Sequence, residues 1–223
     1  MSMTGPAKID FLSDVDYVCP MKRNAYSDDE IKREPQFFSA DLEYVVDHGG
    51  PITKDFVFSL PVNWRSENLI IDSRVHMLMP GWYPCIPGWH LDDVPRNRAD
   101  GQPDHTSPLN QTRHLTAIVG DESQTIFGIG SFSLMDVPIG AGVVYSIWHK
   151  EVELLVSRGV VVEKKLEPGQ VMLFNHKTWH RGAAATKSGW RWFIRATIGS
   201  SRRFRNEMRT QTQVYLTAPF EGW

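Results

Sequence analysis

Hydrophobic and polar positions alternate along much of the chain in short runs that glycine and proline interrupt. An alternation with a period of two residues is typical of strands with one buried face. Many short strands with frequent turns predict an all-β sandwich or barrel. The predicted strands are DFVFSLPV (55–62), SRVHMLMP (73–80), TRHLTAIVG (112–120), QTIFGIG (124–130), VELLVSRGVVVEKKL (152–166), QVMLFN (170–175) and WRWFIRATIG (190–199).

Two local signals refine this pattern. The stretch SDDEIKRE (27–34) predicts a short helix, because Ser27 can cap it and Glu30 stands three residues later, as a capping box requires. Pro168-Gly169 predicts a tight turn before the next strand. We therefore expect a mainly β chain with a few flanking helices.

One stretch, LDDVPRNRADGQPDHTSPLNQ (91–111), lacks periodicity and is rich in proline and polar residues. A loop of about 20 residues inside a compact domain is usually functional or disordered. It directly follows the first candidate metal ligands described below. We therefore expect residues 93–111 to form a lid or a substrate loop.

Composition indicates an ordinary globular chain. The 223 residues suit one domain spanning 1–223, with 41% hydrophobic and 22% charged residues. The net charge of -2 argues against broad binding to nucleic acid. One basic stretch is interpreted as a solvated helix face, with an anion or nucleic-acid contact as the alternative. It contains Arg202, Arg203, Arg205 and Arg209.

The two cysteines, Cys19 and Cys85, are too few for a disulfide framework or a cysteine-rich zinc site. No apolar run of about 18 residues predicts a membrane span, and the N-terminal residues do not read as a signal peptide. We therefore expect a cytoplasmic protein in a reducing compartment. The oligomeric state is left open, with a homo-oligomer among the options.

The first chemical motif is Gly88-Trp89-His90-Leu91-Asp92. Residues i and i+2 of a strand point to the same side, so His90 and Asp92 can both face one metal ion. Trp89 and Leu91 would then pack on the other side. By itself the pair is also compatible with an exposed histidine and acid at the end of a strand.

The second motif is FNHKTWHRG (174–182), which follows an apolar strand and contains His176 and His180. We take His180 as the third ligand, because it directly precedes Arg181-Gly182, where the chain can turn into the next strand. His176 is the competing candidate. Two histidines and one carboxylate on one face form the triad typical of non-heme Fe(II) oxygenases, which leaves coordination positions open.

The third motif is GWRWFIRAT (189–197), in which Arg191 and Arg195 share one face if the segment is a strand. A buried arginine needs an anionic partner. A guanidinium binds a carboxylate through two parallel hydrogen bonds, so a dicarboxylic acid bound to iron is one candidate partner. A structural ion pair with Asp or Glu is the alternative.

The order of H-x-D, a distal His and then an Arg on the next strand resembles the Fe(II)/2-oxoglutarate-dependent dioxygenases. The run from Arg191 to Thr197 is similar to the R-x-x-x-R-x-T segment of the taurine dioxygenase branch, and the spacing also resembles the phytanoyl-CoA hydroxylase branch. The resemblance covers roughly residues 70–200 and identifies no subfamily. It implies a double-stranded β-helix, also called a jelly roll, which is cupin-like in shape.

This resemblance also implies roles for residues. Residues 71–200 would form the β-helix core and residues 1–70 would support it. The triad His90, Asp92 and His180 would hold Fe(II), and 2-oxoglutarate and O2 would complete the reaction. Arg191 is the first choice for the distal carboxylate of 2-oxoglutarate and Arg195 the second. Thr116 and Tyr83 are weaker candidates for contact with it, and His114 is a candidate for the pocket wall.

The expected outcome is oxidation of an organic substrate, a small molecule or a piece derived from a small biopolymer, most simply by hydroxylation. Two rivals stay open. One is a cupin-like isomerase or dioxygenase that does not use 2-oxoglutarate and takes an extra ligand from His176 or His114. The other is a non-catalytic β-sandwich that binds carbohydrate or protein, in which some of the eight tryptophans would stack on sugars.

Overall fold

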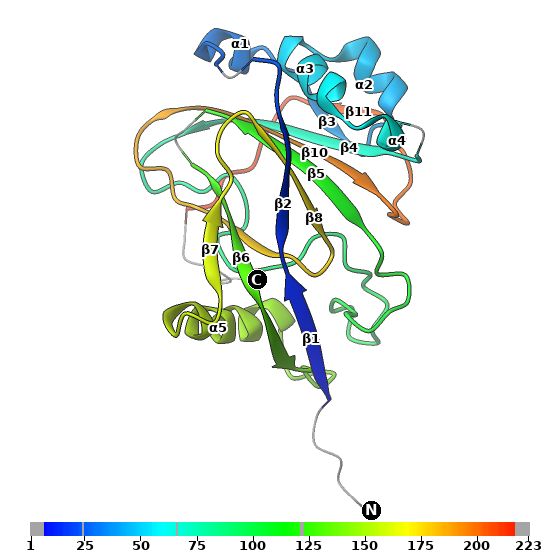
Figure 1. The fold of residues 1–223 in the computed structure, drawn as a ribbon, viewed down its shortest axis with the longest axis vertical. Helices are drawn as coiled ribbons and strands as arrows, with labels where there is room; N and C mark the ends of the chain where they lie inside the picture. Colours follow the sequence, from blue (N-terminus) through cyan, green and yellow to red (C-terminus); the bar gives the residue numbers. More distant parts are fainter. Residues whose placement is uncertain (1–6, 24, 66, 121–122, 217–223) are drawn as a thin grey trace, which may run out of the picture.

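The structure is a computed structural model that describes residues 7–23, 25–65, 67–120 and 123–216. This part of the chain is mainly β, as the alternation predicts, and its paired strands are antiparallel (Figure 1). The larger sheet has the order β2-β8-β5-β10-β4. Its strands are β2 (Val15–Pro20), β8 (Gln170–Asn175), β5 (Arg113–Val119), β10 (Gly189–Ile198) and β4 (Ile70–Leu78).

In the second sheet, the long strand β6 (Thr125–Met135) pairs with three others. The three are β1 (Lys8–Ser13), β7 (Val162–Lys165) and β9 (Trp179–Gly182). A short third sheet joins β11 (Glu207–Arg209) to β3 (Gln36–Phe38). The N-terminal ribbon passes from β1 in the second sheet into β2 in the larger one, so the segment 1–70 contributes strands to both (Figure 1).

Apolar side chains from both sheets meet in one cluster, which packs the sheets together. Val15, Ile118 and Phe174 come from the larger sheet, and Phe127 comes from the second. A larger cluster fills the space between the outer face of the larger sheet and the helices α1 (Asp28–Lys32), α2 (Leu42–His48), α3 (Pro51–Ser59) and α4 (Val62–Arg65).

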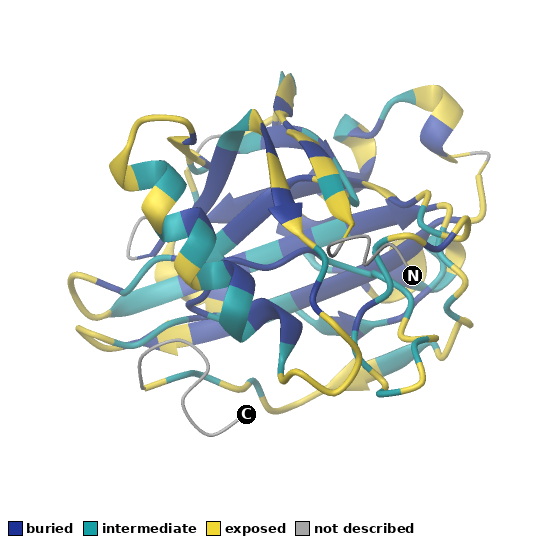
Figure 2. Cartoon of the chain, turned by 90° about the horizontal axis from the view of Figure 1, so that it is seen from below, coloured by how far each residue is buried: buried dark blue, intermediate teal, exposed yellow. Residues whose placement is uncertain are grey.

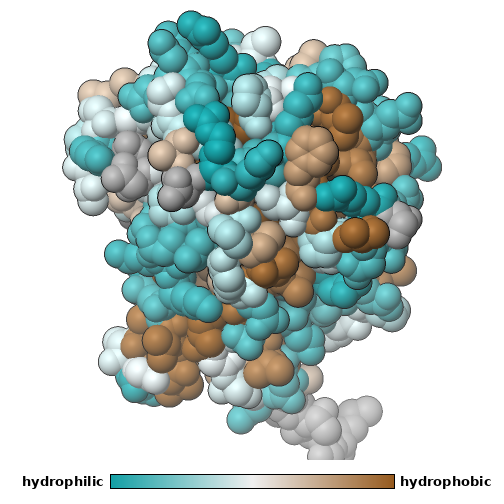
Figure 3. All heavy atoms as spheres, turned by 45° about the horizontal axis from the view of Figure 1, so that its top comes forward, coloured by the Kyte–Doolittle hydropathy of each residue, from teal (hydrophilic) through white to brown (hydrophobic). Residues whose placement is uncertain are grey.

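A third cluster, rich in tryptophan, packs helix α5 (Val144–Ser157) against the second sheet. Trp89, Trp148 and Trp179 are fully buried there. Figure 2 shows buried residues along the interior strands and exposed ones on the outer turns and loops. On the face seen in Figure 3, the exposed apolar side chains form small patches between hydrophilic ones. None of the helices in the described ranges has the length and apolar character needed to cross a bilayer.

Five of the expected strands are found, and they are β4, β5, β6, β8 and β10. The strand expected at 55–62 is wrong, because this segment belongs to helices α3 and α4. The alternation placed Phe56, Phe58 and Val62 on one face, yet Phe58 is 71% and Val62 82% exposed. The buried positions Ile52, Phe56 and Leu60 instead follow the four-residue spacing of a helix.

The strand expected at 152–166 is wrong in its first part, where α5 continues to Ser157. The helical period starts upstream of that window, with Val144, Trp148 and Val152 buried at intervals of four residues. Gly159, with a φ of 71°, follows the end of the helix, and β7 begins only at Val162.

Two smaller predictions are confirmed and one is wrong. Ser27 and Glu30 form the capping box of α1, and Gly169 makes the predicted turn with a φ of 76°. The helix face expected for the C-terminal arginines is absent from the described residues. Arg202 lies in an irregular segment, and Arg209 ends the strand β11.

A buried carboxylate substitutes for the missing side-chain cap of α3. The helix follows Gly50, which has no side chain to cap it, and Glu34 accepts hydrogen bonds from the backbone N–H groups of Ile52 at 2.7 Å and Thr53 at 3.2 Å. The Thr53 hydroxyl donates to the same carboxylate at 2.6 Å. A Cβ at Gly50 would lie 2.4 Å from Glu34 Oε1, so only glycine admits this approach. Burial raises the pKa of Glu34.

We expect Glu34→Ala to lower the free energy of unfolding by about 1–3 kcal/mol, because it leaves buried N–H groups of α3 without an acceptor. Glu34→Gln should cost less, since an amide oxygen still accepts. Urea unfolding measures both, and the exposed Asp47→Ala on α2 is the control, with a change within about 0.5 kcal/mol. An Ala variant as stable as the control would contradict the capping role.

Candidate metal centre

Three side chains from distant parts of the chain converge on one point. His90, Asp92 and His180 each present one ligand atom, and these atoms lie within 4.8 Å of one another. The Nε2 atom of His180 is 3.2 Å from Asp92 Oδ2, and that of His90 is 3.9 Å from Asp92 Oδ1. Among the described residues, these three side chains form a group of histidine and acidic ligands that could hold a metal ion.

The backbone holds the two histidines side by side. His90 N donates to His180 O at 3.0 Å and His180 N donates to His90 O at 3.1 Å, which forms an isolated antiparallel bridge. His180 lies on β9, whereas His90 lies outside any regular strand. The predicted alternation still holds locally, because Trp89 and Leu91 are buried in the apolar cluster beneath α5.

Both imidazoles are anchored in the same tautomer. His90 Nδ1 bonds to Gly88 O at 2.7 Å and His180 Nδ1 bonds to Thr178 O at 3.0 Å. A carbonyl oxygen only accepts, so each Nδ1 must carry the proton. Each Nε2 atom then faces Asp92. Metal-binding histidines are typically oriented by a hydrogen bond of this kind on the second ring nitrogen.

The charges of the site favour a cation. Burial and the neighbouring His180 lower the pKa of His90 to about 4, so its ring is neutral at neutral pH and free to bind a metal. Burial alone would raise the pKa of Asp92, but Arg195 and the imidazoles outweigh it and hold that pKa well below the usual range. The triad therefore offers the neutral imidazole of His90, the Nε2 atom of His180 and one carboxylate.

Asp92 is held in place by Arg195, which sits on β10. One guanidinium nitrogen of Arg195 donates to Asp92 Oδ2, and another lies 3.2 Å from Asp72 and 3.7 Å from Asp93. Arg202 completes the network at 2.8 Å from Asp72 and 3.2 Å from Asp93. Asp93 adopts a left-handed backbone with a φ of 53°, which aspartate tolerates better than most residues. The strand partner of Arg195 is also Asp72.

The network of Arg195 changes the sequence-based expectation for that residue. It was the second choice for 2-oxoglutarate, with a structural ion pair as the alternative. The structure shows ion pairs with three aspartates, of which one is a candidate metal ligand. Arg195 is therefore a positioning group for Asp92 in this geometry.

The triad lies beside a cavity of about 520 Å³ between the two sheets. Arg191 is in its wall, 2% exposed, with Nε donating to Ser123 O at 2.8 Å and Nη2 to Thr125 Oγ1 at 3.3 Å. Thr116 also lines the cavity, and its hydroxyl donates to Ile194 O at 2.8 Å. The triad and Arg191, the first choice for binding 2-oxoglutarate, therefore line the same cavity.

Other sequence candidates do not line this cavity. Tyr83 forms a backbone bridge with Tyr215 at the edge of the site, and Tyr215, not Tyr83, is in the wall. His114 is buried behind the wall, where its Nδ1 bonds to Thr197 Oγ1 at 3.0 Å. Residues 93–111 contribute no lining side chain, so their role as a lid stays a prediction.

A segment that sequence reasoning overlooked forms the outer wall instead. The stretch 209–215 runs from β11 along the cavity and contributes Arg209, Gln211, Thr212, Gln213 and Tyr215. It is kept in place by the pairing of β11 with β3 and by the Tyr83–Tyr215 bridge. The one available signal was the basic stretch 202–209, which ends at the first residue of this segment, Arg209.

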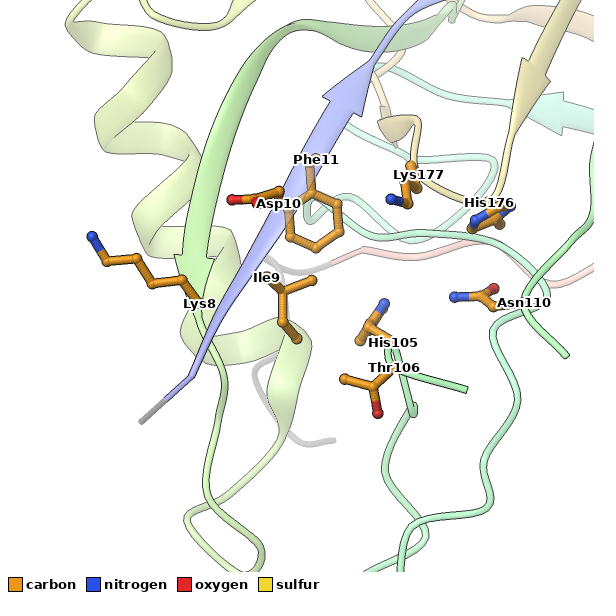
Figure 4. A pocket seen from close by; sticks show the side chains of 9 residues that line it. All are labelled: Lys8, Ile9, Asp10, Phe11, His105, Thr106, Asn110, His176 and Lys177. Atoms are coloured by element: carbon orange, nitrogen blue, oxygen red, sulfur yellow. The ribbon is translucent and has the colours of Figure 1, made fainter. Parts of the chain in front are cut away.

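The competing ligand His176 lies elsewhere. It lines a separate cavity of about 290 Å³ with His105, Asn110 and residues of β1 (Figure 4). The metal-binding group contains His180 and not His176. The preference for His180 thus matches the geometry, but the turn expected at Arg181-Gly182 is wrong, because both residues belong to β9.

Searches against protein-family models and against curated proteins found no match for this chain. Among solved structures, similarity was found to EvdMO1 (14% identity, TM-score 0.37, 67% of this chain and 33% of that one). A second is an N-substituted L-amino acid dioxygenase in complex with alpha-KG from Burkholderia ambifaria AMMD (16%, 0.31, 57% and 47%). A third is iron-bound HygX from Streptomyces hygroscopicus (12%, 0.36, 89% and 84%).

The chain spans about a third of the length of EvdMO1 and about half of the Burkholderia protein. At TM-scores below 0.5 this likeness carries no weight for fold or activity. What the site can do chemically therefore follows from its own side chains. Two histidines and one carboxylate with an adjacent cavity suit an octahedral ion such as Fe(II), which keeps open positions for other ligands.

We expect His180→Ala to abolish stoichiometric binding of Fe(II) or Mn(II), because two ligands cannot hold the ion against solvent at micromolar concentration. His176→Ala is the matched control, a histidine from the same segment that lines the other cavity. Anaerobic titration followed by metal analysis measures the difference. Equal metal content in the two variants would reject His180 as a ligand.

Proposed function

We propose that this chain is an Fe(II)/2-oxoglutarate-dependent oxygenase whose two sheets form a double-stranded β-helix. One observation carries the proposal. Two imidazoles with their Nδ1 protons bound to carbonyls converge with a carboxylate at the wall of a cavity that also contains a buried arginine. Neither a structural zinc site nor a simple polar core needs an adjacent cavity with a buried guanidinium.

In this proposal His90, Asp92 and His180 hold the iron on one face. With 2-oxoglutarate and O2, bound iron supplies oxidative decarboxylation to succinate and CO2 together with oxidation of the substrate. Arg191 binds the distal carboxylate of 2-oxoglutarate through its guanidinium fork. Thr116 offers a hydroxyl oxygen to the same molecule. Arg195 fixes the orientation of Asp92 and takes no part in binding 2-oxoglutarate.

Apolar rings surround part of the triad. Phe127 and Phe174 line the cavity next to His180, with ring centroids 6.0 and 5.3 Å from its imidazole. Trp89 and Trp179 are fully buried behind the two histidines. An apolar surround of this kind limits side reactions of a reactive oxidant with solvent and protein.

Two observations favour this proposal over the rival functions. A cupin-like protein without 2-oxoglutarate would take an extra ligand from His176 or His114, and neither belongs to the group of converging ligand atoms. A sugar-binding sandwich needs exposed tryptophans. Four of the tryptophans are fully buried, namely Trp89, Trp148, Trp179 and Trp192.

We expect 2-oxoglutarate to stabilise the Mn(II)-loaded protein by about 2.7 kcal/mol when present at 100 times its dissociation constant. Arg191→Met should remove most of this stabilisation, and Arg191→Lys, which keeps the charge but not the fork, should retain part of it. Thermal unfolding with Mn(II) measures the effect, and Arg158→Met, an exposed arginine at the end of α5, is the control. Stabilisation unchanged in Arg191→Met would reject that residue as the binding group.

We expect Arg195→Met to weaken metal binding by about 10–100-fold, since partners of metal ligands typically have effects of this size. Arg191→Met should leave metal affinity in the absence of 2-oxoglutarate unchanged. Calorimetric titration of each variant with Mn(II) separates the two roles. An Arg195 variant with normal metal affinity and lost 2-oxoglutarate binding would reverse the assignment.

A further inference from the structure

The cavity beside the triad has a charged floor made by two paired strands. Alternate residues of β4 and β10 face it in three register pairs, which are Asp72 with Arg195, Arg74 with Phe193, and His76 with Arg191. All six side chains line the cavity. This floor extends the site well beyond the triad and the proposed 2-oxoglutarate contact.

Most of the cationic groups around the cavity are matched by anionic ones. Arg195 and Arg202 are held by Asp72, Asp92 and Asp93. At the outer wall, Arg209 Nε donates to Glu207 at 3.0 Å, and its guanidinium stacks over Phe38 at 3.4 Å from the ring centre. These arginines therefore have structural partners within the protein.

Arg74 differs from these arginines. Within the described ranges it forms no hydrogen bond and no ion pair, although it is only partly exposed and its side chain lines the cavity. A guanidinium in such a position requires an anionic ligand or water to satisfy its five donors. Its position opposite Phe193 places it between the Asp72–Arg195 pair and the His76–Arg191 pair.

A second polar group lines the cavity beside Arg74. His76 is 2% exposed and lies two residues along β4 from Arg74. Its ring nitrogens lie near backbone groups of Pro84 and Gln213 but make no full hydrogen bond with either. Burial, Arg191 and Arg74 together lower its pKa to about 3, so the ring is neutral at neutral pH. A neutral imidazole offers one N–H donor and one acceptor to a ligand.

The cavity also has an apolar surface beside its polar lining. Phe37, Phe38, Pro84, Ile86 and Phe193 form it, together with Tyr215, whereas Gln36 and the stretch 209–213 contribute polar groups. A ligand that satisfies both surfaces has a hydrocarbon or aromatic body and one anionic head group. A planar carboxylate matches the fork of a guanidinium in two parallel hydrogen bonds.

We infer that the substrate is a small organic acid, whose carboxylate is bound by Arg74 and His76 and whose apolar body lies against the phenylalanines beside the triad. The inference rests on the proposed function, because it identifies the substrate class of that same site. Arg191 and Arg74 then have different partners. Arg191 binds the co-substrate, and Arg74 selects the molecule to be oxidised.

The test compares acids with their neutral amides. Phenylacetate and phenylacetamide, and hippurate and hippuramide, are titrated by calorimetry into Mn(II)-loaded protein that holds 2-oxoglutarate. We expect at least one acid to bind about tenfold more tightly than its amide, a difference of roughly 1.4 kcal/mol. Arg74→Met should remove this preference, and His76→Phe should reduce it. Arg158→Met should keep it.

Binding of Mn(II) and of 2-oxoglutarate is measured first in every variant. If the unchanged protein binds neither Mn(II) nor 2-oxoglutarate, that result counts against the proposed function. The acids and amides are then titrated into protein without Mn(II) or 2-oxoglutarate, and their comparison still tests this inference. The inference is overturned if no acid binds more tightly than its amide, or if Arg74→Met retains the preference. It is also overturned if Arg74→Met loses 2-oxoglutarate, since Arg74 would then serve the co-substrate.

Discussion

The contact between Arg195 and Asp92 is the interaction on which the candidate metal centre depends. Transferring a carboxylate from water to a protein interior costs several kcal/mol unless a counter-charge and hydrogen bonds compensate it. Before a metal binds, Arg195 supplies that counter-charge. The same guanidinium contacts Asp72 on β4 and Asp93 in the following loop, so one group ties the ligand to the larger sheet and to the chain beyond it.

The two histidines depend on a different kind of constraint. Each is oriented by a carbonyl two residues earlier in the chain, Gly88 O for His90 and Thr178 O for His180. The backbone bridge between the two residues then fixes the separation of the rings. Local geometry therefore orients each imidazole, while long-range pairing brings them together. A candidate ligand set built in this way is assembled by the protein's own contacts.

The triad was predictable from sequence because its information is local. H-x-D, a distal histidine and a following arginine-rich strand each occupy a few adjacent residues, and their order restricts the chemistry. The helix at α3 was missed because Phe56, Phe58 and Val62 alternate by coincidence, and because its capping carboxylate, Glu34, is far away in sequence. An alternation with a period of two residues therefore could not by itself distinguish the helix α3 from a strand.

The cavity wall was harder to predict, since it depends on strand register. Nothing in the isolated stretch SRVHMLMP indicates that Arg74 lies opposite Phe193, or His76 opposite Arg191. The stretch 209–215 lies along the cavity because β11 pairs with β3, which is more than 160 residues earlier in the chain. Nearby, the hydrogen-bonded residues Asp41 and Asn206 are 165 residues apart in the sequence. Pairings across such distances leave no trace in local composition.

The origin of that outer wall has an evolutionary consequence. The candidate ligands come from β9 and the segment 90–92, whereas other residues that line the cavity come from β3 and the stretch 209–215. Replacements in these two segments can reshape the cavity without changing the candidate ligands or the groups that orient them. Related chains can therefore diverge in the molecules they accept while they keep the same triad.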